Sequence, residues 1–435
     1  MIENLRWLLL GLTGVLFFAD LVQSFFYLRA ADAAESHPRT LPNSPASQLP
    51  NFPTSQLSNS PTPSDHMSHG LYYSCLFAFF GAMVFAILAP SLPLLWVAVE
   101  LTTLVSAPLI AYHRTAGSLE AMWKYILICS IGIGLALFGT MLVMHAQTTG
   151  SVMWHKTGFA FVLAGYGTKM GLAPFHTWLP DAHSEAPAPV SALLSGALLN
   201  CSFLAIARFR EVMPAGAGPF CDGALLALGI LSVAVAAVFM VRQTDFKRLL
   251  AYSSVEHMGI VATLFALYWR LGGPSVESRS ADLVGLAIFG HVVVHSLTKT
   301  ALFLTAGNLL LSYGTRAIAA VQGLGTAMKG HAALWIAGTL LICGMPPSIL
   351  FLTELGLVVS APVWVSATVL LLLFIVFAAM VRAALGMVMG EVKAQPTPLP
   401  KLHALVPSVL VSALVAGGVV FTALTVLDVM RGGAL

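Results

Sequence analysis

Long apolar stretches follow one another along most of this sequence, and each is about as long as a lipid bilayer is thick. Residues 5–28 form the first stretch, and a helix needs ~20 apolar residues to cross the hydrocarbon core. The later stretches lie at 71–89, 92–112, 121–145, 154–175, 188–210, 221–242, 250–270, 283–313, 331–358, 362–389 and 405–430. This pattern predicts an all-α polytopic membrane protein with about twelve transmembrane helices.

The segment between the first two stretches has a different composition. Residues 30–69 are rich in Pro, Ser, Asn and Thr, contain the loose repeat SQLPNFPTSQLSNSPT, and cannot bury enough apolar area to fold. The chain is therefore expected to have four parts. They are an N-terminal transmembrane helix (1–29), a disordered linker (30–69), a transmembrane core (70–390), and a C-terminal loop and transmembrane helix (391–435). A cleavable signal peptide is the alternative for the first stretch, and Asp20 near its end is expected at the membrane interface.

Composition supports a membrane location and excludes several function classes. Of the 435 residues, 58% are hydrophobic and 9% are charged, whereas soluble domains carry about 25% charged residues. The net charge of +3 is too small to indicate a nucleic-acid partner. The five cysteines are scattered without CxxC or metal-ligand spacing, and no dinucleotide or phosphate-binding motif occurs. A multi-pass membrane protein with no metal, redox cofactor or catalytic residue of its own is therefore expected. Charges in the loops do not fix its orientation.

Residues 164–200, AGYGTKMGLAPFHTWLPDAHSEAPAPVSALLSGALLN, place a lysine inside an apolar run. Gly171 and Pro174 follow Lys169, so the helix is expected to break there. A charge at membrane depth costs at least ~2.5–3.5 kcal/mol unless it faces a partner or a cavity. We therefore predict that Lys169, with His176 after it, lies on an ion pathway. The alternative is a lysine that extends from a helix end to the lipid headgroups.

Ionisable residues also interrupt two other apolar stretches. Glu100 has apolar sequence on both sides, which favours a proton or ion role over a structural ion pair between helices. His291, His295 and Lys299 follow at i, i+4 and i+8, so they share one helix face and form a ladder of roughly 12 Å. Because histidine titrates near neutrality, such a ladder suits proton relay.

A second interrupted stretch lies in the C-terminal half. Pro346–Pro347 break an apolar run, and Glu354 follows within about two turns. Two broken segments, each with its own charge, are typical of inverted-repeat transporters. Lys247, in RQTDFKRLLAYSSVEHMG, fits either this pathway or a basic loop, and Glu256 and His257 could extend the polar track.

Three motifs together resemble a known family: PFHTWLPDAHSEAPAPVSALLSG after Lys169, DFKRLLAYSSVEHMG, and HVVVHSLTKTALFLTAG. Over residues 71–390 the chain resembles the antiporter-like membrane subunits of respiratory complex I, membrane-bound hydrogenases and Mrp-type sodium/proton antiporters. The resemblance implies two inverted five-helix repeats, each with a broken helix, and a central polar axis that carries protons. By position it assigns that axis to Glu100, Lys169, His291, His295, Lys299 and Glu354.

Two departures from the family pattern refine the resemblance. Several respiratory members carry a lysine in the helix after the first broken one, whereas this chain has Asn200 there. Together with LLSGALLNC and Glu354, this is most similar to the hydrogenase-4 type F subunit. The family usually has four spans before the helix with the glutamate; here two are counted, and the Pro/Ser-rich linker stands where two spans would be.

The expected function is proton translocation by a membrane subunit of a redox-driven complex, in a prokaryotic inner membrane. The resemblance implies sister membrane subunits and a soluble redox module that carries flavin, iron–sulfur or metal centres. The alternatives are a cation/proton antiporter component, a proton channel coupled to a non-redox partner such as an inorganic-carbon uptake protein, and a structural membrane anchor.

Overall fold

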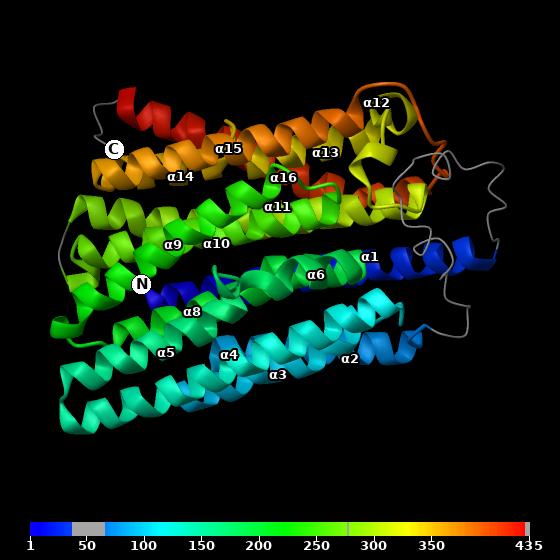
Figure 1. The fold of residues 1–435 in the computed structure, drawn as a ribbon. Coiled ribbons are helices and arrows are strands. Elements are labelled where there is room, and N and C mark those ends of the chain that lie inside the picture. Colours follow the sequence, from blue (N-terminus) through cyan, green and yellow to red (C-terminus); the bar gives the residue numbers. More distant parts are fainter. Residues whose placement is uncertain (37–65, 276–277, 431–435) are drawn as a thin grey trace.

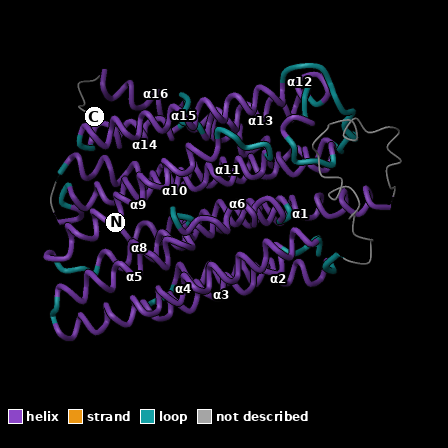
Figure 2. The backbone as a smooth tube through the Cα atoms, viewed as in Figure 1, coloured by secondary structure: helices purple, strands orange, loops and turns teal. Residues whose placement is uncertain are grey.

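Helices make up almost the entire computed structural model, which describes residues 1–36, 66–275 and 278–430 (Figure 1). No strand occurs within these residues, apart from an isolated bridge between Asp245 and Ala317. Most helices run roughly parallel or antiparallel to one common axis, and loops gather at the two ends of the bundle (Figure 2). Ten helices in the described part are long and apolar enough to cross a membrane. With the two broken helices, α5–α6 and α13–α14, the described part has about twelve membrane crossings, as the sequence predicts.

The chain folds into a first helix and two sets of five crossings, followed by a last helix. The first helix is α1 (Ile2–Ser36), and the last is α16 (Leu405–Met430) after the short η8 (Lys401–Ala404). The first set comprises α2 (His69–Leu88), α3 (Leu92–Ile110), α4 (Ala116–Thr149), the broken pair α5 (Val152–Met170) and α6 (Trp178–Glu185), and α7–α8 (Ala188–Leu193 and Leu199–Glu211). The second comprises α9 (Gly218–Met240), α10 (Phe246–Arg270), α11 (Arg279–Tyr313), the broken pair α13 (Lys329–Ile342) and α14 (Ile349–Ser360), and α15 (Val363–Val388), with α12 (Leu324–Ala327) in a connection. Because five crossings end on the opposite side, the second set is inverted relative to the first.

Both helix breaks contain a glycine with a left-handed backbone. Gly171 has φ +81° and Gly344 has φ +64°, conformations that L-residues with a side chain rarely adopt. A proline follows each glycine within three residues and prevents the helix from resuming at once. After the first break, η3 (Phe175–Thr177) leads into α6. The sequence prediction of two interrupted helices is thus confirmed.

The two central crossings are completely enclosed by the others. The most apolar windows of α7–α8 and α10 are 100% buried, whereas those of α2, α4 and α15 are between 33% and 39% buried. Polar residues on α7, α8 and α10 are therefore shielded from lipid, while the outer helices present apolar side chains to it. The crossing after α7 also contains a π-helical turn, Leu194–Leu198, a distortion that often accompanies functional sites.

The N-terminal helix differs from its prediction in length and in burial. α1 continues to Ser36, past the expected boundary at residue 29, and residues 37–65 of the predicted linker lie outside the described residues. α1 packs against α11, α7, α2 and α8. Asp20, expected at the membrane interface, is instead fully buried in this contact. The interface prediction was wrong because the polar face of α1 points into the bundle rather than towards headgroups.

Candidate functional site

Lys169 lies in the last turn of α5, immediately before the break, and its side chain is fully buried. Its ammonium donates to the hydroxyl of Thr103 on α3 at 3.0 Å and to that of Tyr125 on α4 at 2.5 Å. The ammonium also lies 4.4 Å from the Tyr125 ring centroid and 5.9 Å from that of Trp178 on α6. Hydroxyls and aromatic faces therefore hold the cation, as expected for a buried ammonium without a direct carboxylate partner.

Glu100 reaches Lys169 through hydroxyl groups rather than by a direct ion pair. The Thr103 hydroxyl donates to one carboxylate oxygen of Glu100 at 3.4 Å, and Ser130 on α4 donates to the other at 3.0 Å. Thr103 thus contacts both the carboxylate and the ammonium of Lys169. The hydroxyl can accept a proton from one side and donate one to the other, so it links the two groups chemically.

A second polar cluster joins α10, α11 and α14. Nδ1 of His257 lies 3.0 Å from Nε2 of His291, and Nδ1 of His291 lies 2.9 Å from the hydroxyl of Thr353. The ring of His295 lies 5.1 Å from that of His257, and neither nitrogen of His295 has a hydrogen-bond partner in the described chain. Three buried imidazoles in contact, which can each carry a proton on either nitrogen, provide a relay of short steps.

Two carboxyls and a lysine complete this second cluster. Lys299 on α11 is fully buried and donates to the carbonyl of Leu250 at 2.7 Å and to the hydroxyl of Ser253. Glu256, beside His257 on α10, is buried and close enough to Lys299 and Glu354 to interact electrostatically. The Glu354 carboxylate lies over the second break, where a Cβ atom on Gly344 would be 2.5 Å from its Oε2. A larger residue at Gly344 would therefore displace the carboxylate.

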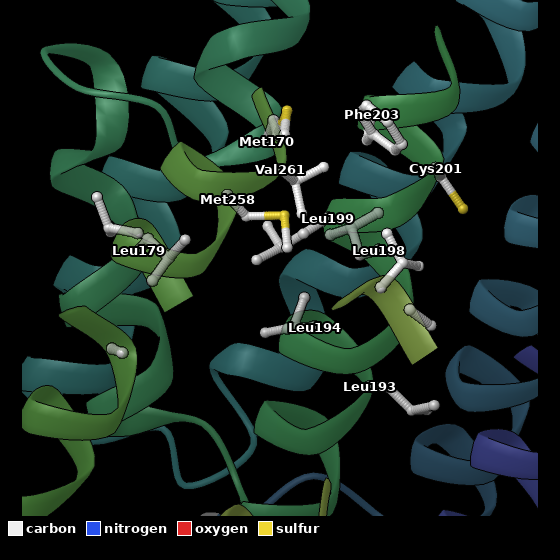
Figure 3. Close-up of a cluster of buried hydrophobic side chains, with 14 of the residues drawn as sticks. Met170, Leu179, Leu193, Leu194, Leu198, Leu199, Cys201, Phe203, Met258 and Val261 are labelled. Atoms are coloured by element: carbon white, nitrogen blue, oxygen red, sulfur yellow. The ribbon is translucent and has the colours of Figure 1, made fainter. Parts of the chain in front are cut away.

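A group of buried apolar side chains adjoins both the Lys169 site and the histidine cluster. Met170 follows Lys169, Met258 follows His257, and both belong to one group with Leu199 and Val261 (Figure 3). Two polar pairs lie alongside this group. Ser195 of the π-helical turn is 2.8 Å from Ser254 on α10, and Asn200 on α8 donates to Ser296 on α11 at 2.8 Å.

Three further ionisable side chains lie towards the α6 end of the bundle. His176 of η3 is buried with its ring 6.1 Å from that of Tyr252, and its Nδ1 has no partner in the described residues. His183 on α6 stacks on Phe303 at 4.8 Å. Lys247, at the start of α10, is fully buried and donates to the carbonyls of Ser184 at 3.1 Å and Ala186 at 2.6 Å, which lie at the C-terminal end of α6.

The predicted site residues fall into these clusters, but their contacts differ from the sequence-based picture. The predicted ladder of His291, His295 and Lys299 makes its contacts with α10 rather than along α11 itself. Glu100 and Lys169 make no direct ion pair in the described structure, because the hydroxyl of Thr103 lies between them. Sequence reasoning also missed several polar partners, since single Ser, Thr and Tyr residues in apolar runs carry little signal: Thr103, Tyr125, Ser130, Ser195, Ser253, Ser254, Ser296 and Thr353.

No group of three or more His, Cys, Asp or Glu side chains is placed to hold a metal ion in the part of the chain that the structure describes. The five cysteines are all free thiols. The buried ionisable groups contact hydroxyls, backbone carbonyls and each other, and imidazoles in such contacts can pass protons.

The fold and the site together define a polytopic membrane protein of two inverted five-helix repeats with a charged residue at each helix break. The family model described as "NADH:quinone oxidoreductase/Mrp antiporter, TM" matches residues 89–382, more than half of the chain. The chain belongs to this family, which confirms the resemblance drawn from its motifs.

Individual relatives come from several kinds of complex. The chain is 38% identical over 323 residues to the hydrogenase-4 component F homolog of Methylacidiphilum infernorum, covering 69% of this chain and 64% of that protein. It is 32% identical over 306 residues to one of the Na(+)/H(+) antiporter subunits of Alkalihalophilus pseudofirmus, covering 65% of this chain and 37% of that protein. The chain thus spans less than two thirds of either relative's length. The solved structure of the Mrp complex from Dietzia sp. superimposes with a TM-score of 0.75 at 18% identity, over 97% of this chain and 81% of that chain, a likeness of fold.

Proposed function

We propose that this chain translocates protons as a membrane subunit of a redox-driven complex of the hydrogenase-4 or NADH:quinone oxidoreductase type. One observation carries the proposal: a buried ammonium at one helix break is linked through a hydroxyl to the Glu100 carboxylate, and the helix that bears Glu354 at the other break contacts a pair of buried imidazoles through Thr353. Ionisable groups inside a membrane protein are energetically costly, so the presence of so many favours a role in transport.

The proposed route begins at Glu100 and Lys169. When the hydroxyl of Thr103 links them, the nearby carboxylate favours the ammonium form of the lysine and a proton is held. When the two groups separate, burial favours the neutral amine and the proton leaves. His176 and Lys247 are proposed to connect this part of the route with the C-terminal end of α6.

From the first site the proton is proposed to pass to the histidines of α10 and α11. The pairs Ser195–Ser254 and Asn200–Ser296 provide polar steps beside the apolar group that contains Met170 and Met258. Water that enters this region during turnover would complete the path, and the apolar side chains would oppose a continuous leak.

The last part of the proposed route runs over His291, His295 and Lys299 to Glu354. His257 contacts the imidazoles of His291 and His295, and the neighbouring Glu256 interacts electrostatically with both Lys299 and Glu354. Glu354, at the second break, would release the proton to the far side. Because α10 contacts each member of the α11 ladder, a small movement of α10 would change all three steps together.

The drive is proposed to come from partners. Against a membrane potential of about 200 mV, one proton needs roughly 4.6 kcal/mol, more than a modest pKa change of one group supplies. We infer sister membrane subunits and a soluble module with flavin, iron–sulfur or metal centres, in a prokaryotic inner membrane. The names of the relatives, a hydrogenase-4 component and one of several antiporter subunits, support a place in a multi-subunit assembly.

The test is to purify the chain with its native partners, identify them, and reconstitute the complex in sealed vesicles. We expect a redox enzyme among the partners and proton movement that requires its electron donor in sodium-free medium.

Proton movement that requires sodium and no donor would instead favour the antiporter alternative, which the likeness to a Na(+)/H(+) antiporter component supports. A partner without redox cofactors would favour the non-redox channel. If the combined Lys169→Ala and Glu100→Gln variant pumps normally, the chain is an anchor.

A further inference from the structure

Asp20 of α1 is a buried carboxyl that lies outside the route described above. Its side chain has 0% of its surface exposed, and neither carboxylate oxygen has a hydrogen-bond partner in the described chain. An ionised carboxylate without any partner is too costly to keep in an apolar interior. The group must therefore be neutral in this arrangement or gain a cation from outside the chain.

The residue is part of a polar stripe along one face of α1. At 3.6 residues per turn, positions 13, 24 and 27 fall on the same face as Asp20, and position 23 lies beside them. All of these positions are buried against neighbouring helices, and they are occupied by Thr13, Asp20, Gln23, Ser24 and Tyr27.

Hydrogen bonds tie this stripe to three other elements. The hydroxyl of Ser24 lies 3.1 Å from that of Tyr72 on α2. The amide of Gln23 donates to the side chain of Asn308 on α11 at 3.2 Å and to the carbonyl of His403 in η8 at 3.3 Å. Asn308 also donates to that carbonyl, at 2.8 Å. Polar groups thus continue from Asp20 towards the Tyr27 end of α1.

In the other direction, the stripe reaches the central helices. A Cβ atom at Gly196, in the π-helical turn, would lie 3.2 Å from Leu16 of α1 and 2.9 Å from the hydroxyl of Thr300. The carbonyl of Ser296 would be 3.1 Å away. Asp20 lies one turn after Leu16 on the same face, so it is next to the seam between α1, the π-helical turn and α11.

We propose that Asp20 binds and releases a proton and forms a lateral branch of the pathway, which joins α11 near Ser296. The proposal rests on the proposed function, because a branch requires a main route. The proton would bind to a carboxylate oxygen of Asp20 and leave through the Ser24–Tyr72 hydroxyls or the Gln23–Asn308 amides, with water between them. The Asn200–Ser296 pair would pass it into the central axis.

The surroundings favour a proton over a metal cation. The titratable groups near Asp20 are the phenols of Tyr72 and Tyr27, which are neutral at physiological pH, and η8 adds His403. Lys299, the buried cation of α11, donates to α10 instead. Sodium and other hard cations take several oxygen ligands. Within the described residues, Asp20 belongs to no group of three or more His, Cys, Asp or Glu side chains that could hold a metal ion.

The experiment labels carboxyl groups of the intact complex in its membrane with dicyclohexylcarbodiimide. The O–H of a protonated acid adds across one C=N bond of this apolar reagent to give an O-acylisourea. The acyl group then shifts from oxygen to nitrogen, and the resulting N-acylurea stays on the protein for mass spectrometry. We expect label on the fragment that contains Asp20, insensitive to added sodium, and its loss in Asp20→Asn. Asp32→Asn is the matched control, because Asp32 is on the same helix but has 55% of its side chain exposed.

Proton translocation per electron by the same complexes is the second readout. Because positioned proton donors contribute about 10²–10⁴-fold to a transfer step, Asp20→Asn is expected to lower translocation by about tenfold or more. Asp32→Asn is expected to pump normally. Three results would each overturn the branch. The first is an unlabelled Asp20 in a complex whose Glu354 is labelled, and the second is protection of Asp20 by sodium. The third is normal pumping by an assembled Asp20→Asn complex. Failure of the main route would show separately, as normal pumping by Lys169→Ala.

Discussion

The two helix breaks hold their charges by different means. At the first, Lys169 precedes the break, and the hydroxyls of Thr103 and Tyr125 hold its ammonium from two other helices. At the second, Glu354 follows the break and lies over Gly344, while its neighbour Thr353 contacts the imidazole of His291 on α11. The first site holds one charge with hydroxyls from two helices, and the second places a carboxyl near groups that exchange protons readily.

This difference indicates how the two halves would share the work. A cation with several hydroxyl partners keeps its position when one partner is lost, because the others remain. A relay of imidazoles depends on each ring being correctly oriented, so one missing contact interrupts it. Apart from loss of Lys169 itself, substitutions at the second site are therefore expected to lower transport more than substitutions at the first.

Among substitutions other than Lys169→Ala, the largest effect is expected for Glu354→Gln. The amide cannot accept and release the proton, so proton translocation should fall by about 10²-fold or more. The measurement is vesicle acidification per electron by the assembled complex. Glu211→Gln, an exposed position at the end of α8, is the control and should pump normally. Normal pumping by Glu354→Gln would remove the second break from the route.

Glu100→Gln should be less severe, about tenfold, because Thr103 and Tyr125 still hold the ammonium of Lys169. The same acidification assay applies, with assembly checked by co-purification of the partners. A loss greater than that of Glu354→Gln would reverse the comparison between the two breaks.

Matched removal of one hydroxyl at each site gives a finer test. Thr353→Val deletes the contact to His291 and should lower transport about two- to tenfold, the equivalent of 0.5–1.5 kcal/mol for one hydrogen bond. Thr103→Val makes the same chemical change beside Lys169, where Tyr125 remains, and should cost less. Equal losses for the two valines would show that the sites do not differ in this respect.

The smallest effect on transport is expected at Lys247, which lies at the edge of the proposed route and whose substitution should also lower stability. Lys247→Met leaves the carbonyls of Ser184 and Ala186 without their donor, at a cost of about 1–3 kcal/mol. Thermal unfolding of the purified complex measures this loss. Arg248→Met is the control, because Arg248 has 41% of its side chain exposed. A stable Lys247→Met protein that pumps poorly would assign Lys247 mainly to the proton route.

The helical plan of this protein could be predicted from its sequence because it follows from composition and spacing. Apolar runs of bilayer length marked the spans, and Gly171 with Pro174 marked a break. Buried charges in such runs pointed to the site, since membranes rarely contain them without a role.

The contacts inside the site could not be predicted in the same way. The partners of Lys169 come from α3 and α4, and helical periodicity does not tell which helices become neighbours. The same reason explains why Asp20 was placed at the interface: its position near the end of an apolar run was known, but the burial of α1 against α7 and α11 was not. Hydroxyl residues such as Thr103 and Ser130 look ordinary in sequence, and only three-dimensional packing shows their role.

The most direct test of the proton route is acidification per electron by complexes that carry Lys169→Ala. Lys156→Ala is the control, because this lysine lies on the same helix, α5, but at its opposite end and only partly buried. If protons pass the first helix break, Lys169→Ala should assemble, transfer electrons and pump almost no protons, whereas Lys156→Ala pumps normally. An assembled Lys169→Ala complex with the same ratio of protons to electrons as the unsubstituted protein would contradict the account.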